Sequence, residues 1–145
     1  MFPNSRVKVE HSKLVGARPE KVYAILAQME HHKRILPDAF TGVTASADGT
    51  FFITVKIGYA KKTLHIRQEE TEPNELFREI DLLTNILTEF RLEPHPDGTL
   101  VTIASEYEAK GIVGFIESIF APKLLRQLYE EELTKLCRYA LIATV

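Results

Sequence analysis

The sequence predicts an α+β domain: a seven-stranded, curled antiparallel sheet wrapped around a long C-terminal helix, with two short helices after the first strand. Three observations predict it. Apolar residues recur at every second position between residues 40 and 110, and at helical spacing after residue 111. Turn sequences divide the middle of the chain into short segments. The 145 residues fit a single domain over 1–145 and hardly allow two.

The first strand is expected over residues 6–15, where apolar and polar residues alternate weakly. Pro19 then suits the first turn of a helix, because its missing N–H would have no partner there anyway. Helical spacing continues before Pro37, which disfavours a helical conformation in the preceding residue. Two short helices with a bend are expected from the apolar residues Val22, Tyr23, Ile25, Leu26, Met29, Ile35 and Leu36.

Six strands joined by hairpins are expected between residues 40 and 110. In the segment 76–82 we expect Leu76, Ile80 and Leu82 to face inward, although Phe77 is out of phase with them. Residues that favour turns separate the strands at Asp48-Gly49, Pro73-Asn74, Thr84-Asn85 and Pro96-Asp97-Gly98.

One amphipathic helix is expected from Ile112 to Leu141. Pro122 removes a backbone hydrogen bond inside it, so the helix should kink or divide there. Two interpretations stay open. In the first, the kink only adapts the helix to the curvature of the sheet. In the second, residues 112–121 move as a gate over the mouth of an internal chamber between the helix and the sheet.

The widths of these elements imply that chamber. Seven strands at ~4.8 Å spacing make a sheet roughly 29 Å across, whereas a helix with side chains is roughly 10–12 Å wide. A single helix therefore covers the sheet only if the sheet curls, which leaves an interior for side chains or a ligand. The residues expected to line it and bind a ligand are Phe51, Ile53, Val55, Leu64, Ile66, Arg78, Ile80, Thr88, Phe90, Ile103, Ser105, Tyr107, Phe115, Ile119 and Leu128.

The polar members of this set suggest an anchor. Tyr107, with Thr88 and Ser105 beside it, would bind a ligand carbonyl or hydroxyl, or act as an acid. The alternative is a buried tyrosine whose hydroxyl is satisfied by backbone or water. An inward Arg78 would hold a carboxylate, whereas an arginine at a strand end usually lies in solvent.

Other titratable residues are interpreted as structural. His31 and His32 are adjacent, so on a helix they point about 100° apart and do not chelate one metal from one face. We expect solvated histidines, no metal and no cofactor. Glu130-Glu131-Glu132 is interpreted as a solvated helix face, and Cys137 as a small apolar packing residue.

Composition narrows the partners. Eighteen basic and twenty acidic residues give a formal net charge of −2, which excludes nucleic-acid binding by bulk electrostatics. There is no apolar run of eighteen residues, so no integral membrane segment is expected. The first residues lack the apolar run of a signal peptide, and the lone cysteine excludes an internal disulfide. We expect a cytoplasmic protein that is a monomer or a weak homodimer.

Three segments resemble the START-like (SRPBCC) superfamily of helix-grip proteins, which includes polyketide cyclase/dehydrase and lipid-transport proteins. They are Ala17-Arg18-Pro19-Glu20-Lys21-Val22-Tyr23-Ala24-Ile25-Leu26, then Ile35-Leu36-Pro37, and Gly111-Ile112-Val113-Gly114-Phe115 leading into Leu133-Thr134-Lys135-Leu136. The resemblance covers nearly the whole chain. It implies a ligand site between the long helix and the sheet, and it transfers no catalytic residue, because the superfamily shares none.

The expected function is therefore binding of a small hydrophobic or amphipathic ligand, such as a lipid, isoprenoid or polyketide-like compound. One alternative is a cyclase or dehydratase that uses the same chamber, with Tyr107 as the acid. The other is an accessory interaction protein whose chamber is filled by its own side chains.

Overall fold

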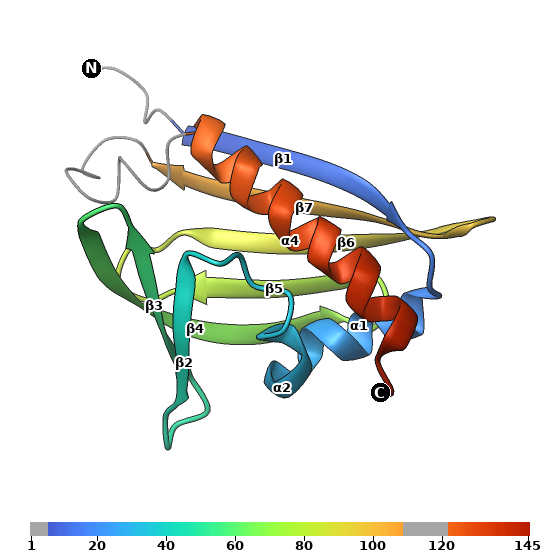
Figure 1. Ribbon diagram of the computed structural model, residues 1–145, viewed down its shortest axis with the longest axis horizontal. Helices are drawn as coiled ribbons and strands as arrows, with labels where there is room; N and C mark the ends of the chain where they lie inside the picture. Colours follow the sequence, from blue (N-terminus) through green and yellow to red (C-terminus); the bar gives the residue numbers. More distant parts are fainter. Residues whose placement is uncertain (1–5, 109–121) are drawn as a thin grey trace.

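A computed structural model describes residues 6–108 and 122–145 (Figure 1). Every strand expected from the sequence is present, and β4 is longer than its alternation suggested. The elements in order are β1 (Arg6–Val15), α1 (Pro19–Ala27), α2 (Met29–His32), β2 (Phe40–Ala45), β3 (Phe51–Ile57), β4 (Ala60–Glu72), β5 (Leu76–Asp81), β6 (Leu87–His95), β7 (Gly98–Glu108) and α4 (Pro122–Ile142).

The seven strands form one antiparallel sheet in the order β1-β7-β6-β5-β4-β3-β2. Strands β2 to β7 follow one another as hairpins, and β1 closes the series by pairing with β7. Figure 1 shows α4 lying across one face of the sheet, with α1 and α2 near its C-terminal end. The curled open sheet gripping a helix confirms the expected helix-grip fold.

The turns use the residues that the sequence indicated. Asn74 and Asn85 adopt φ of 67° and 61°, a left-handed conformation that asparagine tolerates better than most residues. Gly49 and Gly98 also have positive φ, at 85° and 141°. These local preferences favour four of the hairpin turns. The β3–β4 turn, in which Gly58 has a φ of 59°, was not among the expected turns.

The two short helices supply one end of the core. Pro19 lies in the first turn of α1, which buries Val22, Tyr23, Ile25 and Leu26. The second helix, α2, is a single turn and is shorter than expected. Ile35 and Leu36 are buried in the segment that follows it.

The C-terminal helix is described from Pro122 onward. It buries one face, made of Leu125, Leu128, Tyr129, Glu132, Leu133, Leu136 and Ala140. The proposed gate at 112–121, with Phe115 and Ile119, lies outside the described residues. In the two described ranges, no helix has the length and apolar character needed to cross a membrane.

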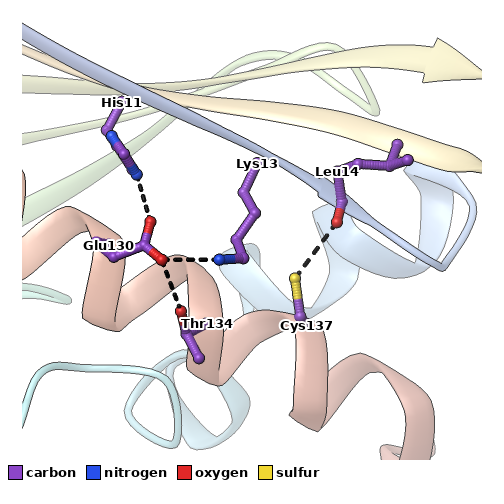
Figure 2. Close-up of polar contacts among 6 residues, drawn as sticks. All are labelled: His11, Lys13, Leu14, Glu130, Thr134 and Cys137. Atoms are coloured by element: carbon purple, nitrogen blue, oxygen red, sulfur yellow. Dashed lines mark hydrogen bonds and ion pairs between the residues drawn. The ribbon is translucent and has the colours of Figure 1, made fainter.

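A polar cluster fixes α4 against β1 (Figure 2). The Glu130 carboxylate contacts the His11 imidazole and accepts a 2.8 Å hydrogen bond from Lys13. The hydrogen bond with Lys13, and to a smaller extent that with His11, lowers the pKa of Glu130 to about 2. Two helical turns further, the half-buried Cys137 thiol donates to the Leu14 carbonyl oxygen at 3.4 Å, and burial raises the pKa of this thiol. These contacts hold the helix in place, and its buried face lies over the sheet.

Candidate functional site

A pocket lies between α4, the sheet and the segment that precedes β2. Its volume is about 60 Å³. Most of its wall is apolar, and polar side chains from β5, β6, β7 and α4 converge on it. The wall consists of Leu36, Pro37, Phe40, Ile53, Leu64, Ile66, Glu79, Asp81, Ile86, Thr88, Phe90, Ser105, Leu125, Leu128, Tyr129 and Glu132.

Part of the expected ligand set belongs to this wall: Ile53, Leu64, Ile66, Thr88, Phe90, Ser105 and Leu128. Val55 and Ile103 are fully buried in the core but do not reach the pocket. Phe51 is half-buried on the same face of β3 as Ile53, because side chains alternate along a strand. The expected apolar wall is thus only partly the observed one.

The face of β5 that we expected to point inward is wrong. Phe77 is 1% exposed and Glu79 lines the pocket, so Arg78 and Ile80 lie on the opposite face of the strand. The Arg78 Nε lies 3.8 Å from a carboxylate oxygen of Glu89 on β6, and its side chain remains 36% exposed. A shift of one residue moves every side chain of a strand to the opposite face. The acidic Glu79 therefore faces the pocket, where Ile80 was expected.

The turn after β5 explains this phase. One Asp81 carboxylate oxygen accepts a 2.5 Å hydrogen bond from the Thr84 hydroxyl, and the other accepts bonds from the His65 and Leu83 amides at 2.9 and 3.4 Å. Asp81 is buried while it makes these bonds. Because Asp81 faces inward, Glu79 and Phe77, at two and four residues before it, face inward as well.

Tyr129, from α4, supplies the phenol that the sequence analysis assigned to Tyr107. Tyr107 is buried on β7 but is not part of the pocket wall. The Tyr129 hydroxyl contacts that of Ser105, which lies 2.7 Å from the Thr88 hydroxyl. Burial raises the pKa of Tyr129, so its phenol stays protonated. Thr88 is a further hydrogen-bond partner of Tyr129, so the three hydroxyls form one cluster in the pocket wall.

His32 is buried, contrary to the expected solvated histidine. It is 1% exposed, and its ring packs edge-on against Phe90 with the centroids 5.5 Å apart. Its Nδ1 donates a 2.8 Å hydrogen bond to the Leu26 carbonyl oxygen, so this nitrogen carries a proton. Its Nε2 lies 3.6 Å from the Glu132 carboxylate, which is buried although we expected a solvated helix face.

The electrostatics of this pair involve Glu79. Burial by itself lowers the pKa of His32, but the contact with Glu132 and the charge of Glu79 outweigh it and raise the pKa to about 9. Burial raises the pKa of Glu79 to about 7, against the lowering effect of the His32 charge. At neutral pH, an imidazolium is therefore buried among carboxyl groups, and Glu79 is poised to gain or lose a proton.

Helical spacing in the sequence already indicated that His32 and Glu132 could be buried. His32 lies three residues after Met29 and four before Leu36, while Glu132 lies four from both Leu128 and Leu136. Both positions therefore fall on apolar helix faces. Our interpretation followed residue type, since histidine and glutamate usually lie in solvent. Within residues 6–108 and 122–145, no cluster of three or more His, Cys, Asp or Glu is arranged to hold a metal ion.

Comparison with known proteins decides the family. The family described as polyketide cyclase / dehydrase and lipid transport matches residues 6–140. The chain belongs to this family. No curated protein sequence matches it. Membership is consistent with a ligand-binding fold and agrees with the superfamily that the sequence motifs resemble.

Several solved structures share the fold of this family member. The KanY protein has 20% identity and a TM-score of 0.79, over 94% of this chain and 99% of KanY. A Thalictrum norcoclaurine synthase mutant, in complex with a transition-state analogue, has 12% identity and a TM-score of 0.74, over 97% and 98% of the two chains. The di-domain ARO/CYC StfQ, from the steffimycin biosynthetic pathway, has 12% identity and a TM-score of 0.70, over 94% of this chain and 51% of StfQ. Identities this low establish the fold alone.

Proposed function

We propose that this protein binds a small hydrophobic or amphipathic molecule, of a lipid, isoprenoid or polyketide-like kind, between the curled sheet and α4. The observation that carries the proposal is the pocket itself, in which an apolar wall meets the hydroxyls of Thr88, Ser105 and Tyr129. Small-molecule sites are commonly built in this way: apolar burial supplies affinity and a few polar groups fix orientation. Membership of a cyclase and lipid-transport family supports it.

The pocket volume bears on how such a ligand enters. About 60 Å³ is well below the roughly 300–1,000 Å³ of sites that enclose drug-sized molecules. The polar end of a ligand fits this space, and a longer apolar part requires wall side chains to move. Four apolar side chains form the wall on the side of α4, the segment before β2 and the start of β2: Leu36, Phe40, Leu125 and Leu128.

Filling the pocket tests the proposal. Leu128→Trp places a larger side chain in the wall and should weaken binding of 1-octanol at least tenfold, measured by isothermal titration calorimetry. Leu128→Met conserves the side-chain volume and should leave the affinity within about threefold. Urea unfolding of both variants verifies that they are folded. Equal binding by the tryptophan variant and the unsubstituted protein would place the ligand elsewhere.

A second candidate, a cyclase or dehydratase, is favoured by Glu79. A carboxyl group with a pKa of about 7 is suited to accept or return a proton at neutral pH. The protonated Tyr129, rather than Tyr107, lines the pocket as a hydrogen-bond donor to a substrate carbonyl. The first step would be transfer of a proton from the carbon beside the carbonyl to Glu79, with the electron pair moving to the oxygen.

Deuterium exchange separates the catalyst from the carrier. In D₂O above neutral pH, the protein should accelerate exchange of the α-hydrogens of 2-octanone, followed by NMR. Glu79→Gln should reduce this acceleration by about 10²–10⁴-fold, the usual contribution of a general base, without abolishing ketone binding. Absence of acceleration by the unsubstituted protein would leave binding alone as its function.

A further inference from the structure

We infer that the pocket selects a ligand whose polar end is an uncharged hydroxyl group and rejects ligands that end in a carboxylate. The inference rests on the proposed function and specifies the ligand class of the same site. It follows from two features of the wall: the sign of its charged side chains and the hydrogen-bonding capacity left over by its polar groups.

Among residues 6–108 and 122–145, the charged side chains that line the pocket are all acidic. Glu79, Asp81 and Glu132 line the pocket, and the described part of the chain contributes no lysine, arginine or histidine to it. His32 does not belong to the wall, and its charge already faces Glu132 at 3.6 Å. A ligand carboxylate would therefore enter a poorly solvated space beside like charges, where the described wall offers no cation to pair with it.

The phase of β5 produces this charge. With Arg78 inward, as the sequence analysis expected, the wall would contain a guanidinium able to hold a carboxylate. The structure instead directs Arg78 toward Glu89 and gives the inward position to Glu79. The one-residue difference in phase thus reverses the ligand charge that the site accommodates.

The hydrogen-bonding capacity points to a hydroxyl rather than a carbonyl or an ether. Glu132 is 7% exposed, and its Oε2 faces His32 Nε2 at 3.6 Å but accepts no hydrogen bond from any described residue. The Thr88, Ser105 and Tyr129 hydroxyls contact one another, and each is able to donate or accept a hydrogen bond. A ligand hydroxyl can donate to Glu132 and accept from one of the three hydroxyls, whereas an ether or ketone only accepts and leaves Oε2 with the 3.6 Å contact to His32 alone.

Three ligands of similar size test the inference: 1-octanol, its isomer heptyl methyl ether, and octanoate. Their affinities are measured at pH 8 by calorimetry on the unsubstituted protein. We expect 1-octanol to bind most tightly, the ether about tenfold more weakly for want of a donor, and octanoate on the order of 100-fold more weakly through charge repulsion.

Variants assign the selectivity to the acidic wall. Glu79→Gln should improve octanoate relative to 1-octanol at least tenfold. Glu79 is chosen because Glu132 is also the partner of His32. Glu89→Gln removes an acid from the other face of the sheet and should leave the ratio unchanged. Octanoate binding as tightly as 1-octanol, or a ratio that Glu79→Gln does not alter, overturns the inference alone. If none of the three ligands binds, the proposed function fails with it.

Discussion

Replacing His32 with leucine is expected to lower the free energy of unfolding by about 3–5 kcal/mol, the usual cost of removing one partner of a buried ion pair. The substitution leaves the buried Glu132 carboxylate without its cation, 3.6 Å away in the native protein. It also removes the hydrogen bond that Nδ1 donates to the Leu26 carbonyl oxygen. Urea unfolding at pH 7 measures the loss.

A double variant isolates the ion pair from packing. His32→Leu combined with Glu132→Leu removes both charges, and it should recover most of the lost stability, because apolar residues often replace a buried pair at little cost. The single substitution Glu132→Leu should be as harmful as His32→Leu, since it leaves the imidazolium unpaired. A loss of less than about 1 kcal/mol in both single variants would show that the pair contributes little.

The pH dependence of stability supplies an independent readout. The pKa of His32 rises from 6.5 to about 9 on folding, so its contribution is complete below pH 6.5 and is lost as the pH rises through about 9. The pKa of Glu79 rises from 4.5 to about 7, so its contribution is complete below pH 4.5 and is lost as the pH rises through about 7. Unfolding curves should show falling stability over both ranges. His32→Leu should remove the fall in stability between pH 6.5 and about 9, and Glu79→Gln should remove the fall between pH 4.5 and about 7.

Replacing Gly98 with alanine is expected to lower the free energy of unfolding by about 3 kcal/mol or more, through backbone strain and a steric clash. A Cβ at this position would lie 2.0 Å from the Val15 carbonyl oxygen and 3.0 Å from the Gly16 Cα. The φ of 141° is also one that L-residues rarely adopt. Neither side yields easily, because β1 and β7 are paired up to Val15 and Thr99.

Gly42 provides the matched control for that substitution. It lies in β2, and a Cβ there would meet no atom within 4 Å. Gly42→Ala should therefore change the free energy of unfolding by less than about 1 kcal/mol. If Gly98→Ala and Gly42→Ala unfold at the same urea concentration, the close approach of the β6–β7 hairpin to Val15 is not a constraint on the fold.

The fold could be predicted from the sequence because the patterns that indicate it are local. Asn74, Asn85 and Gly98 have backbone preferences that favour a reversal of the chain. Between them, alternation identifies strands, and sheet width against helix width requires curling. These arguments need no knowledge of distant contacts, which explains why the element order and the hairpin pairing of β2 to β7 were predicted correctly, whereas the pairing of β1 with β7 was not predicted.

The site could be predicted only in part from the sequence, because the positions of its polar side chains depend on contacts between residues far apart in the chain. The apolar wall at Ile53, Leu64 and Phe90 followed from alternation. Alternation tells which residues share a face, but β5 has apolar residues on both faces, so it did not tell which face was inside. Asp81, bonded to the turn and to the His65 amide, determines that choice.

The sequence by itself determined the strands, most of the turns and the helix that the sheet grips, because each depends on spacing or backbone preference within a few residues. The family followed from the resemblance of three sequence segments to the START-like superfamily. Only the tertiary structure decided that Tyr129 rather than Tyr107 enters the pocket and that His32 is buried beside Glu132. A charged residue is stable in the interior only with a partner. For His32 that partner comes from a helix one hundred residues away, which no local pattern specifies.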